Sequence, residues 1–373
     1  MLKKDNFSLS QNIKKFGVLD YPILDGMVDW VRVIDRDGNI IYANKAMQKA
    51  FGEHIIGSKC YQLLCNEKRC DFCIGNRTLL TGEVLQKEEV IKGKYYSVKS
   101  SPIKNSEGNI VASVEVFRDV TRERRLELEL VNKNAKMIND LEFAKRIQER
   151  ILPKKGFVEN IKIDYIYKAS GVLSGDMFDI FYIDDENIGI YISDVVGHGI
   201  AASMMTMFIR QTMRAIKDDI LSPSVVLTEL HRRFTILGLE ADKYFTIFYG
   251  VYNKNNHTFK FANAGHNCAP IKYNDDYLEL LEMKGYPITL LFDEIEYEEK
   301  YVKLNKHDKI LFYTDGITEA KDYQGNEFGV EGVIDIINKN PNDLLAEIDN
   351  KIISHNWGEQ KDDFALVLME VLK

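Results

Sequence analysis

Aspartates, most of them beside glycine or a second aspartate, stand at the ends of several apolar segments in the second half of this 373-residue chain. These segments have the length and composition of β-strands, so each aspartate is expected at a strand end. The places are Ser174-Gly175-Asp176 with Asp179 close behind, Asp194 in YISDVVGHG, Asp315-Gly316, and Asp362-Asp363. Carboxylates contributed by separate strand ends are ligands that Mg²⁺ and Mn²⁺ prefer.

Each of these places, taken alone, has a simpler explanation. Asp315-Gly316 after the apolar ILFYT, for example, is a strong signal for a hairpin turn. The whole set is harder to explain as turns, because clustered carboxylates repel one another and raise each other's pKa. A shared cation keeps such groups ionised, so we interpret the set as a candidate metal site.

The second half of the chain alternates strand-like and helical segments. The strand-like runs include IGIYISDVV, YFTIFYGVYN and KILFYTDGI, and the segments 200–217 and 223–238 favour helices. Some strands follow one another directly and others are separated by a helix. This pattern indicates an α+β fold with antiparallel sheets and helices packed outside them, and we place the domain at residues 156–373.

The residues around the aspartates form a longer ordered series of motifs. The series runs VLSGDMFDIF, ISDVVGHGIAASMM, FANAGHNCAP, GYPITLL, HDKILFYTDGITEA, FGVEG and KDDFALVLM. In order and spacing it resembles the metal-dependent Ser/Thr phosphatases of the protein phosphatase 2C (PPM) superfamily. Within that superfamily it is similar to the bacterial branch of stage II sporulation protein E (SpoIIE) and the stress-response phosphatases of partner-switching pathways.

This resemblance implies a β-sandwich flanked by helices and a centre with two Mn²⁺ or Mg²⁺ ions. Asp194 matches the carboxylate that bridges the two ions, and Val195 matches the residue whose main-chain carbonyl binds the second ion. Asp315 and Asp362 match the remaining ligands of the first ion. The implied reaction is hydrolysis of phosphoserine or phosphothreonine by water that the two ions activate.

Three further acids belong to the candidate set. Asp176 matches an acidic residue near the second ion, where it acts directly or through water. Asp179 and Asp363 are adjacent acids, and we keep them as weaker candidates. The resemblance requires no cysteine nucleophile.

Two histidines near these motifs have structural explanations. Many eukaryotic relatives place a proposed general acid two residues after the bridging aspartate, but His198 lies four residues after Asp194, so that role does not transfer. We expect the Gly197-His198-Gly199 turn to let the backbone leave a strand and enter a helix. His266 in FANAGHN is expected in a strand-end loop.

The first part of the chain has a different pattern. WVRVIDRDGNIIYAN reads as a hairpin around Asp37-Gly38, and a second strand pair follows in KYYSVKSSPIKNSEGNIVASVEVFRDVT. Together with YANKAMQKAFG and the closing FRDVTRERRLELEL, this arrangement resembles a PAS domain. We place the PAS sensor at residues 21–120, after an extension at residues 1–20, and its ligand is unknown.

Four of the five cysteines lie in one short segment of the PAS region, CYQLLCNEKRCDFC. They are Cys60, Cys65, Cys70 and Cys73. One tight C-x2-C pair with a looser pair nearby could bind zinc or an iron-sulfur cluster, could sense redox state, or could be ordinary thiols. Cys60 stands where photoactive flavin PAS domains keep a reactive cysteine, but the Asn, Arg and Gln around that cysteine are replaced here.

Between the two domains lies a helix-favouring segment. Residues 121–152 contain no Gly or Pro and are rich in Glu, Lys, Arg and Leu, and Pro153 and Gly156 follow. Apolar residues at steps of three, four or seven, from Leu126 and Leu130 to Met137, favour a parallel homodimer through this helix. Lys133 interrupts the heptad, so a single linker helix (121–155) packed on a neighbouring domain is the alternative.

Composition excludes some classes of partner. With 49 Lys plus Arg against 57 Asp plus Glu, the net charge is −8, and no long basic run is present, so we expect no nucleic-acid or anionic-membrane partner. The first residues are polar, and no apolar segment approaches the roughly 18 residues that span a bilayer. An odd number of cysteines indicates reduced thiols, and we expect a cytoplasmic protein.

The sequence therefore predicts a PAS-regulated phosphoprotein phosphatase. Relatives of the resembled branch act on a phosphorylated anti-sigma factor antagonist (STAS) protein, so that is the expected substrate and partner. We also expect the PAS domain to change the phosphatase rate through the helix. The alternative is a PAS-based redox or ligand sensor with a catalytically silent binding module. Asp176, Asp194, Asp315 and Asp362 are all present, which favours the enzyme.

Overall fold

The structure is a computed structural model that describes residues 20–64, 72–216, 221–355 and 362–372. Cys65 and Cys70 lie outside the described residues. The chain divides into two compact units, Met1–Lys136 and Met137–Lys373. The division falls within the helix α5 (Thr121–Arg150), which is the single long helix that the sequence predicted. The finer domain boundaries given above stay predictions.

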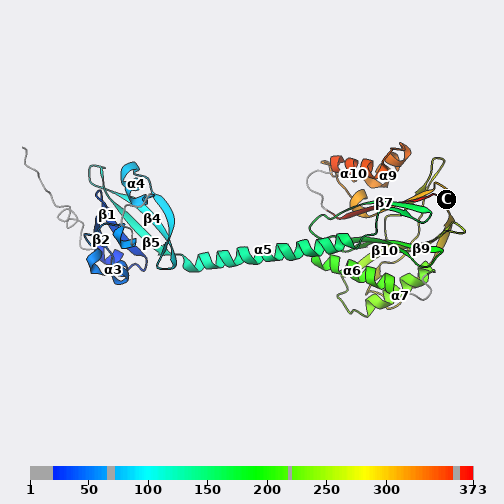
Figure 1. Ribbon diagram of the computed structural model, residues 1–373, viewed down its shortest axis with the longest axis horizontal. Helices are drawn as coiled ribbons and strands as arrows, with labels where there is room; N and C mark the ends of the chain where they lie inside the picture. The colour runs from blue at the N-terminus through cyan, green and yellow to red at the C-terminus, as the bar shows by residue number, and fades with distance from the viewer. Residues whose placement is uncertain (1–19, 65–71, 217–220, 356–361, 373) are drawn as a thin grey trace, which may run out of the picture. The chain divides into compact units, whose positions relative to one another are not determined.

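The first unit is built on one antiparallel sheet in the order β2-β1-β5-β4-β3 (Figure 1). Both predicted hairpins are present, with turns at Gly38 and Gly108, where φ is +80° and +84°. The prediction did not include β3, whose sequence LQKEEVI is largely polar. The strands are β1 (Trp30–Asp35), β2 (Ile40–Ala43), β3 (Leu85–Ile91), β4 (Lys94–Lys104) and β5 (Ile110–Asp119).

Short helices complete the first unit. They are α2 (Asp20–Asp25), α3 (Lys45–Phe51), η1 (Glu53–Ile55), η2 (Gln62–Leu64) and α4 (Ile74–Thr81). Asn44 caps α3, because its side chain accepts a hydrogen bond from the Met47 backbone N–H. Met47 and Phe117 belong to the buried apolar cluster of this unit, and Cys60 lies among them.

The second unit is a sandwich of two antiparallel sheets. One has the order β15-β11-β10-β9-β8, with β14 beside β10, and the other has the order β13-β12-β16-β17-β7-β6. The first sheet contains β8 (Asp176–Tyr182), β9 (Asn187–Val195), β10 (Tyr244–Asn253), β11 (Thr258–Ala264), β14 (Ile288–Thr289) and β15 (Lys300–Lys303). The second contains β6 (Gly156–Val158), β7 (Ile161–Lys168), β12 (Ile271–Tyr273), β13 (Leu278–Leu280), β16 (Lys309–Tyr313) and β17 (Phe364–Val371).

Helices cover both outer faces of this sandwich, which confirms the predicted α+β class. The helices α6 (Ile200–Ala215) and α7 (Pro223–Thr235) cover the sheet of β9 and β10, and α9 (Gly329–Asn338) and α10 (Leu344–His355) cover the sheet of β7 (Figure 1). A four-residue helix, α8 (Asp315–Thr318), follows β16 directly. Among the described residues, no helix is both long enough and apolar enough to cross a bilayer.

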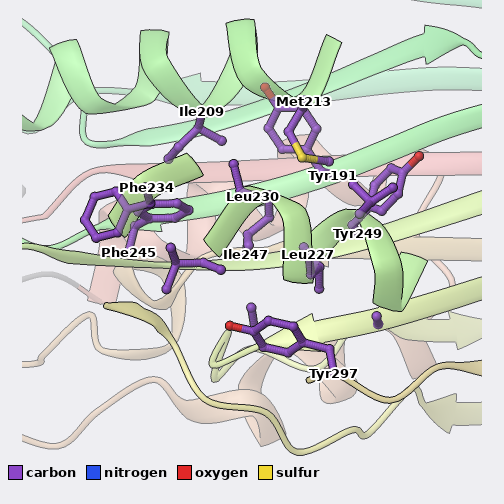
Figure 2. Packing of buried hydrophobic residues seen from close by; sticks show 14 of the residues in the cluster. Tyr191, Ile209, Met213, Leu227, Leu230, Phe234, Phe245, Ile247, Tyr249 and Tyr297 are labelled. Atoms are coloured by element: carbon purple, nitrogen blue, oxygen red, sulfur yellow. The ribbon is translucent and has the colours of Figure 1, made fainter. Parts of the chain in front are cut away.

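Alternate residues of the strands fill separate cores. Ile190 and Ile192 of β9 lie in the core between the two sheets, whereas Tyr191 faces α6 and α7. Figure 2 shows this helix-facing core, where Phe234 of α7 packs edge-on against Phe245 of β10 with ring centroids 5.3 Å apart. Burial on both faces fixes the strand register, because a slip of one residue would exchange the two sets of side chains.

Candidate active site

Asp176 and Asp194 face the same side of the first sheet. Asp176 begins β8, and Asp194 lies near the end of β9. The antiparallel register places the two residues directly opposite each other. Alternation along the strands puts both on the face of Phe178 and Ile192, which is the face toward the second sheet. The two carboxylates therefore stand at one edge of the core between the sheets.

The second sheet supplies two more carboxylates at the same edge. Asp315 follows β16 at the start of α8, and Asp362 precedes β17, the strand that pairs with β16. The chain at Gly316 runs so close to the other segment that an added Cβ would lie 2.0 Å from the main-chain oxygen of Asp363. Glycine is required here because no larger residue permits this approach.

One buried threonine connects the two sheets at this edge. The Thr314 hydroxyl donates a hydrogen bond to Asp176 Oδ2 at 2.7 Å. It also accepts a hydrogen bond from the Ala365 backbone N–H at 2.9 Å. Both Thr314 and Asp176 are almost completely buried, so this contact fixes the Asp176 carboxylate against the second sheet.

The pKa shifts show that these carboxylates lie close enough to repel one another. Burial, followed by Asp315 and Asp362, raises the pKa of Asp194 to about 7. Burial, followed by Asp194, raises the pKa of Asp176 well above its usual value. Burial, together with Asp315 and Asp363, also raises the pKa of Asp362. Ionising the whole set therefore costs free energy unless a cation is present.

Asp179 lies on the opposite face of the sheet from Asp176. The two are three residues apart in one strand, and successive side chains alternate between faces. The Asp179 carboxylate is fully buried and accepts hydrogen bonds of 2.6 and 3.0 Å from Arg214, with Arg210 at 3.4 Å. Its charge is thus balanced by arginine and not shared with the other carboxylates.

The Asp363 carboxylate accepts hydrogen bonds from the loop that leads to Asp176. Its Oδ1 accepts hydrogen bonds from the Ser170 backbone N–H and hydroxyl at 2.6 and 2.8 Å, and its Oδ2 accepts one from the Gly175 N–H at 2.6 Å. The neighbouring Asp362 accepts a hydrogen bond from the Asp363 backbone N–H. Asp363 therefore holds the loop in place beside the site.

Val195 also belongs to this close arrangement. Its backbone N–H donates to the Gly175 oxygen at 3.2 Å, and a Cβ added to Gly175 would lie 3.2 Å from the Val195 oxygen. The Val195 side chain is buried in the helix-facing core. Its carbonyl thus lies next to the loop of Asp176, and its predicted role as a metal ligand stays a prediction.

The histidines occupy the positions that the sequence suggested. Gly197 and Gly199 have φ of +87° and +83°, and α6 begins immediately after them, with the exposed His198 between. His266 is buried, and its two ring nitrogens contact the Tyr313 oxygen at 3.1 Å and the Thr246 hydroxyl at 3.3 Å. Burial lowers the pKa of His266 to about 4, so this ring is neutral at pH 7 and connects strand ends.

Sequence reasoning missed three residues near the site. Besides Thr314, Gln148 near the end of α5 is buried, and it donates to the Ser174 oxygen at 2.8 Å and accepts from the Ser174 N–H at 3.0 Å. Glu319 is the third, and burial and Asp315 raise its pKa. For Gln148, the available signal was a polar side chain in the amphipathic end of the helix. No comparable signal in the sequence marked Thr314 or Glu319, because their contacts depend on how the strands pair.

A cleft opens beside Asp315. The Asn267 side chain donates to Asp315 Oδ2 at 3.3 Å and lines a cleft of about 590 Å³. Tyr286 and Tyr297 line the same cleft, together with Lys284, Glu296 and Glu298 as charged groups. A peptide segment could therefore lie next to the carboxylates.

The donor set fits hard divalent cations. Among the described residues, no three His, Cys, Asp or Glu side chains are close enough to hold one metal ion between them, so the carboxylates share an edge without converging on one point. Mg²⁺ keeps several waters and is usually held by one or two carboxylates, and oxygen donors without sulfur or imidazole suit Mg²⁺ and Mn²⁺.

Comparison with known proteins decides the family. The model of the family described as Stage II sporulation protein E (SpoIIE) matches residues 184–372, half of the chain. The chain belongs to the SpoIIE family. A second model, described as PAS fold, matches residues 24–125. Both resemblances inferred from the sequence are therefore confirmed: a PAS domain precedes a SpoIIE domain of the PPM serine/threonine phosphatase type.

Two curated relatives come from Bacillus subtilis (strain 168). Phosphoserine phosphatase RsbP is 28% identical over 242 residues, which are 62% of this chain and 58% of that protein. Phosphoserine phosphatase RsbU is 32% identical over 189 residues, 50% of this chain and 56% of that protein. The chain thus spans less than two thirds of the length of these relatives.

Among solved structures, the SiaA-PP2C domain of Pseudomonas aeruginosa has the same fold as the second unit. The two superpose with a TM-score of 0.53 at 20% identity, over 65% of this chain and 99% of that domain. At this identity the likeness concerns the fold alone. It confirms the sandwich flanked by helices that the sequence predicted for the SpoIIE domain.

Replacing Asp194 with asparagine should stabilise the metal-free protein. Above pH 7, near the raised pKa of Asp194, the mutation removes a charge that burial and its neighbours disfavour, so the free energy of unfolding should rise by about 1 to 3 kcal/mol. The gain should shrink as the pH falls toward the ordinary pKa of 3.8, because the wild-type group is then protonated. Urea unfolding in EDTA measures the difference.

The matched control is Asp275→Asn, at an exposed position in the β12–β13 turn, which should leave the stability unchanged within about 0.5 kcal/mol. Mn²⁺ should then stabilise the wild type and this control more than Asp194→Asn. A destabilised Asp194→Asn protein in EDTA would show that the carboxylates do not repel one another.

Gly316→Ala should disturb the edge of the second sheet. The new Cβ would meet the Asp363 oxygen at 2.0 Å, so the backbone must move, at a cost of about 1 to 3 kcal/mol. At Gly171 an added Cβ meets nothing within 4 Å, so Gly171→Ala should change the stability by less than about 0.5 kcal/mol. Equal unfolding midpoints for the two variants in urea would contradict the close approach.

Proposed function

We propose that this protein hydrolyses phosphoserine or phosphothreonine in a protein substrate and uses two Mn²⁺ or Mg²⁺ ions. The observation that carries the proposal is the set of mutually repelling carboxylates at one edge of two sheets in a SpoIIE-family chain, with Asp176 buried and Asp194 half-buried. The proposed ligands are Asp176, Asp194, Asp315, Asp362 and the carbonyl of Val195. When bound, the ions would activate a water molecule and neutralise the phosphoryl oxygens.

The side chains around these ligands would keep them in place. Thr314 orients Asp176 through one carboxylate oxygen, and Asp363 holds the Ser170–Gly175 loop. We leave Asp179 out of the proposed ligand set because its charge is paired with Arg214. We also leave out Asp363, since both of its oxygens already accept short hydrogen bonds.

The proposed substrate is a phosphorylated STAS-type anti-sigma factor antagonist. Two curated relatives named phosphoserine phosphatases support the chemistry, and the resemblance to partner-switching phosphatases supports the substrate class. The cleft beside Asp315 would hold residues that flank the phosphoserine. Its aromatic and charged lining suits a peptide better than a small phosphate ester.

Hydrolysis of a serine-phosphorylated STAS protein, measured as phosphate release by the full chain, tests this proposal. Activity should require Mn²⁺ or Mg²⁺ and should be lost on adding EDTA. Asp194→Asn should lower kcat by about 100-fold or more, because a loss of a few kcal/mol of charge stabilisation gives such a factor. Asp275→Asn, at the exposed turn, should retain the wild-type rate.

A second substrate separates chemistry from recognition. p-Nitrophenyl phosphate needs no protein contact, so hydrolysis of it alone would support the metal-dependent chemistry and reject the STAS substrate. If neither substrate shows a metal-dependent difference between wild type and Asp194→Asn, the second unit is a silent binding module and the enzyme proposal fails.

We further propose that the PAS domain controls the rate through α5. Near its start, Arg124 pairs with Glu88 of β3 at 2.8 Å, within the first unit. Near its end, Gln148 binds both main-chain groups of Ser174, and Ile151 packs on the helix-facing core, within the second unit. Ser174 in turn accepts a hydrogen bond from the Asp176 N–H, so a shift of α5 would reach a proposed ligand.

Gln148→Leu in the full chain tests this connection. Leucine keeps the bulk but removes both hydrogen bonds to the Ser174 main chain, so kcat should fall about tenfold while KM for the phosphoprotein stays unchanged. Glu149→Ala, at the exposed neighbouring position, is the control and should keep the wild-type kcat. An unchanged kcat in Gln148→Leu would reject this route of regulation.

The proposed homodimer rests on the apolar side chains of α5. Leu126, Leu130 and Met137, which belong to the apolar pattern in the sequence, are 56%, 60% and 55% exposed in the single chain. A second copy of the helix would remove this apolar surface from water. Ile151, from the same pattern, is already packed on the second unit, as expected for the end of a linker helix.

A further inference from the structure

Two of the clustered cysteines meet inside the first unit. Cys60 follows the η1 turn and is buried in the apolar cluster with Ile34 and Met47. Cys73 precedes α4 and is partly exposed, and its Sγ accepts a hydrogen bond from the Asn76 backbone N–H at 3.4 Å. The Cys60 and Cys73 side chains line the same cavity and lie close enough for each to shift the pKa of the other. Twelve residues separate these two cysteines in the sequence.

The two thiols differ in character. The neighbouring Cys60 thiol and the Asn76 backbone N–H lower the pKa of Cys73 to about 6, against the opposing effect of burial. The neighbouring Cys73 and burial raise the pKa of the Cys60 thiol. Cys73 is therefore the stronger candidate for a thiolate, and Cys60 is a thiol that lies against it. Such a partly exposed thiolate beside a second cysteine is the usual arrangement of oxidation-sensitive thiols.

A small cavity gives access to the pair. Cys60 and Cys73 both line a cavity of about 20 Å³, together with Tyr61 and Asn76. A cavity of this size holds roughly one water-sized molecule. Hydrogen peroxide is of comparable size, whereas a flavin is far too large for this space. The cavity therefore selects small reagents.

We propose that Cys60 and Cys73 form a redox-active thiol pair that a hydroperoxide oxidises to a disulfide. The Cys73 thiolate attacks one peroxide oxygen, the O–O bond breaks, and the leaving hydroxide takes a proton to give water and a Cys73 sulfenic acid. The Cys60 sulfur then attacks the Cys73 sulfur, and the S–O oxygen leaves with the Cys60 proton as a second water. Two thiols lose two electrons, and one hydrogen peroxide becomes two waters.

A disulfide at this position would act on the sheet that leads into α5. The Cys60 oxygen accepts a hydrogen bond from Arg32 Nη1 at 3.0 Å, and Arg32 Nε forms a buried ion pair with Glu115 of β5 at 2.6 Å. Drawing the two sulfurs together to about 2 Å shifts the backbone that carries this oxygen. Because a buried ion pair tolerates little displacement, β5 would respond to the redox state.

Peroxide treatment of the reduced full-length protein tests the pair directly. After blocking free thiols with N-ethylmaleimide and digestion, mass spectrometry should find a peptide pair linking Cys60 to Cys73, and dithiothreitol should remove it. Cys60→Ser should leave a sulfenic acid on Cys73 that dimedone traps. Cys73→Ser should slow peroxide-dependent thiol loss by about tenfold or more. These readouts do not depend on phosphatase activity, so they test the thiol pair independently of the proposed function.

Two control variants make the result specific. Cys268→Ser removes a buried thiol of the second unit, whose pKa burial raises, and should oxidise like the wild type. A variant with Cys65→Ser and Cys70→Ser should still form the link. The proposal fails if Cys73 pairs instead with Cys65 or Cys70, if Cys73 is alkylated no faster than Cys268, or if bound zinc or iron keeps the thiols unreactive until it is removed.

Discussion

Repulsion among carboxylates gathered at one edge of the two sheets is the constraint on which the second unit depends. Asp176, Asp194 and Asp362 all have raised pKa values because burial and neighbouring acids disfavour their charge. A fold that gathers such groups loses free energy at that place and must gain it elsewhere. The compensating free energy comes from burying apolar side chains in three cores, one between the sheets and one beneath each helical layer.

The same cores determine where the carboxylates point. In β9, Ile190 and Ile192 enter the core between the sheets, so Asp194, two residues further, must face the same side at its edge. A slip of one residue would send Asp194 toward α6 and exchange the side chains of the two cores, which the packing of both faces prevents. The register is therefore fixed by apolar packing, and the position of the acidic edge follows from it.

These relations explain what could be predicted from the sequence. The strand-end aspartates, both PAS hairpins and the long helix follow from local patterns, and alternation along β8 could also have separated Asp179 from Asp176. By contrast, the contact of Thr314 with Asp176 joins residues 138 positions apart and exists only after the two sheets pack. The pairing of Cys60 with Cys73 likewise depends on how α4 returns to the sheet, which no spacing rule specifies.

An acidic edge held in this way is sensitive to small movements of its surroundings. The loop before Asp176 is held from three sides, by Asp363, by Val195 and by Gln148 of α5, and only the last belongs to a helix that continues into the first unit. Electrostatic energy between close charges changes steeply with distance in a buried site. A displacement of α5 that moves Ser174 slightly would therefore alter how well the edge accepts a cation while leaving the three apolar cores intact. Under the proposed regulation, a weak signal from the PAS domain would therefore need to act only on the end of one helix.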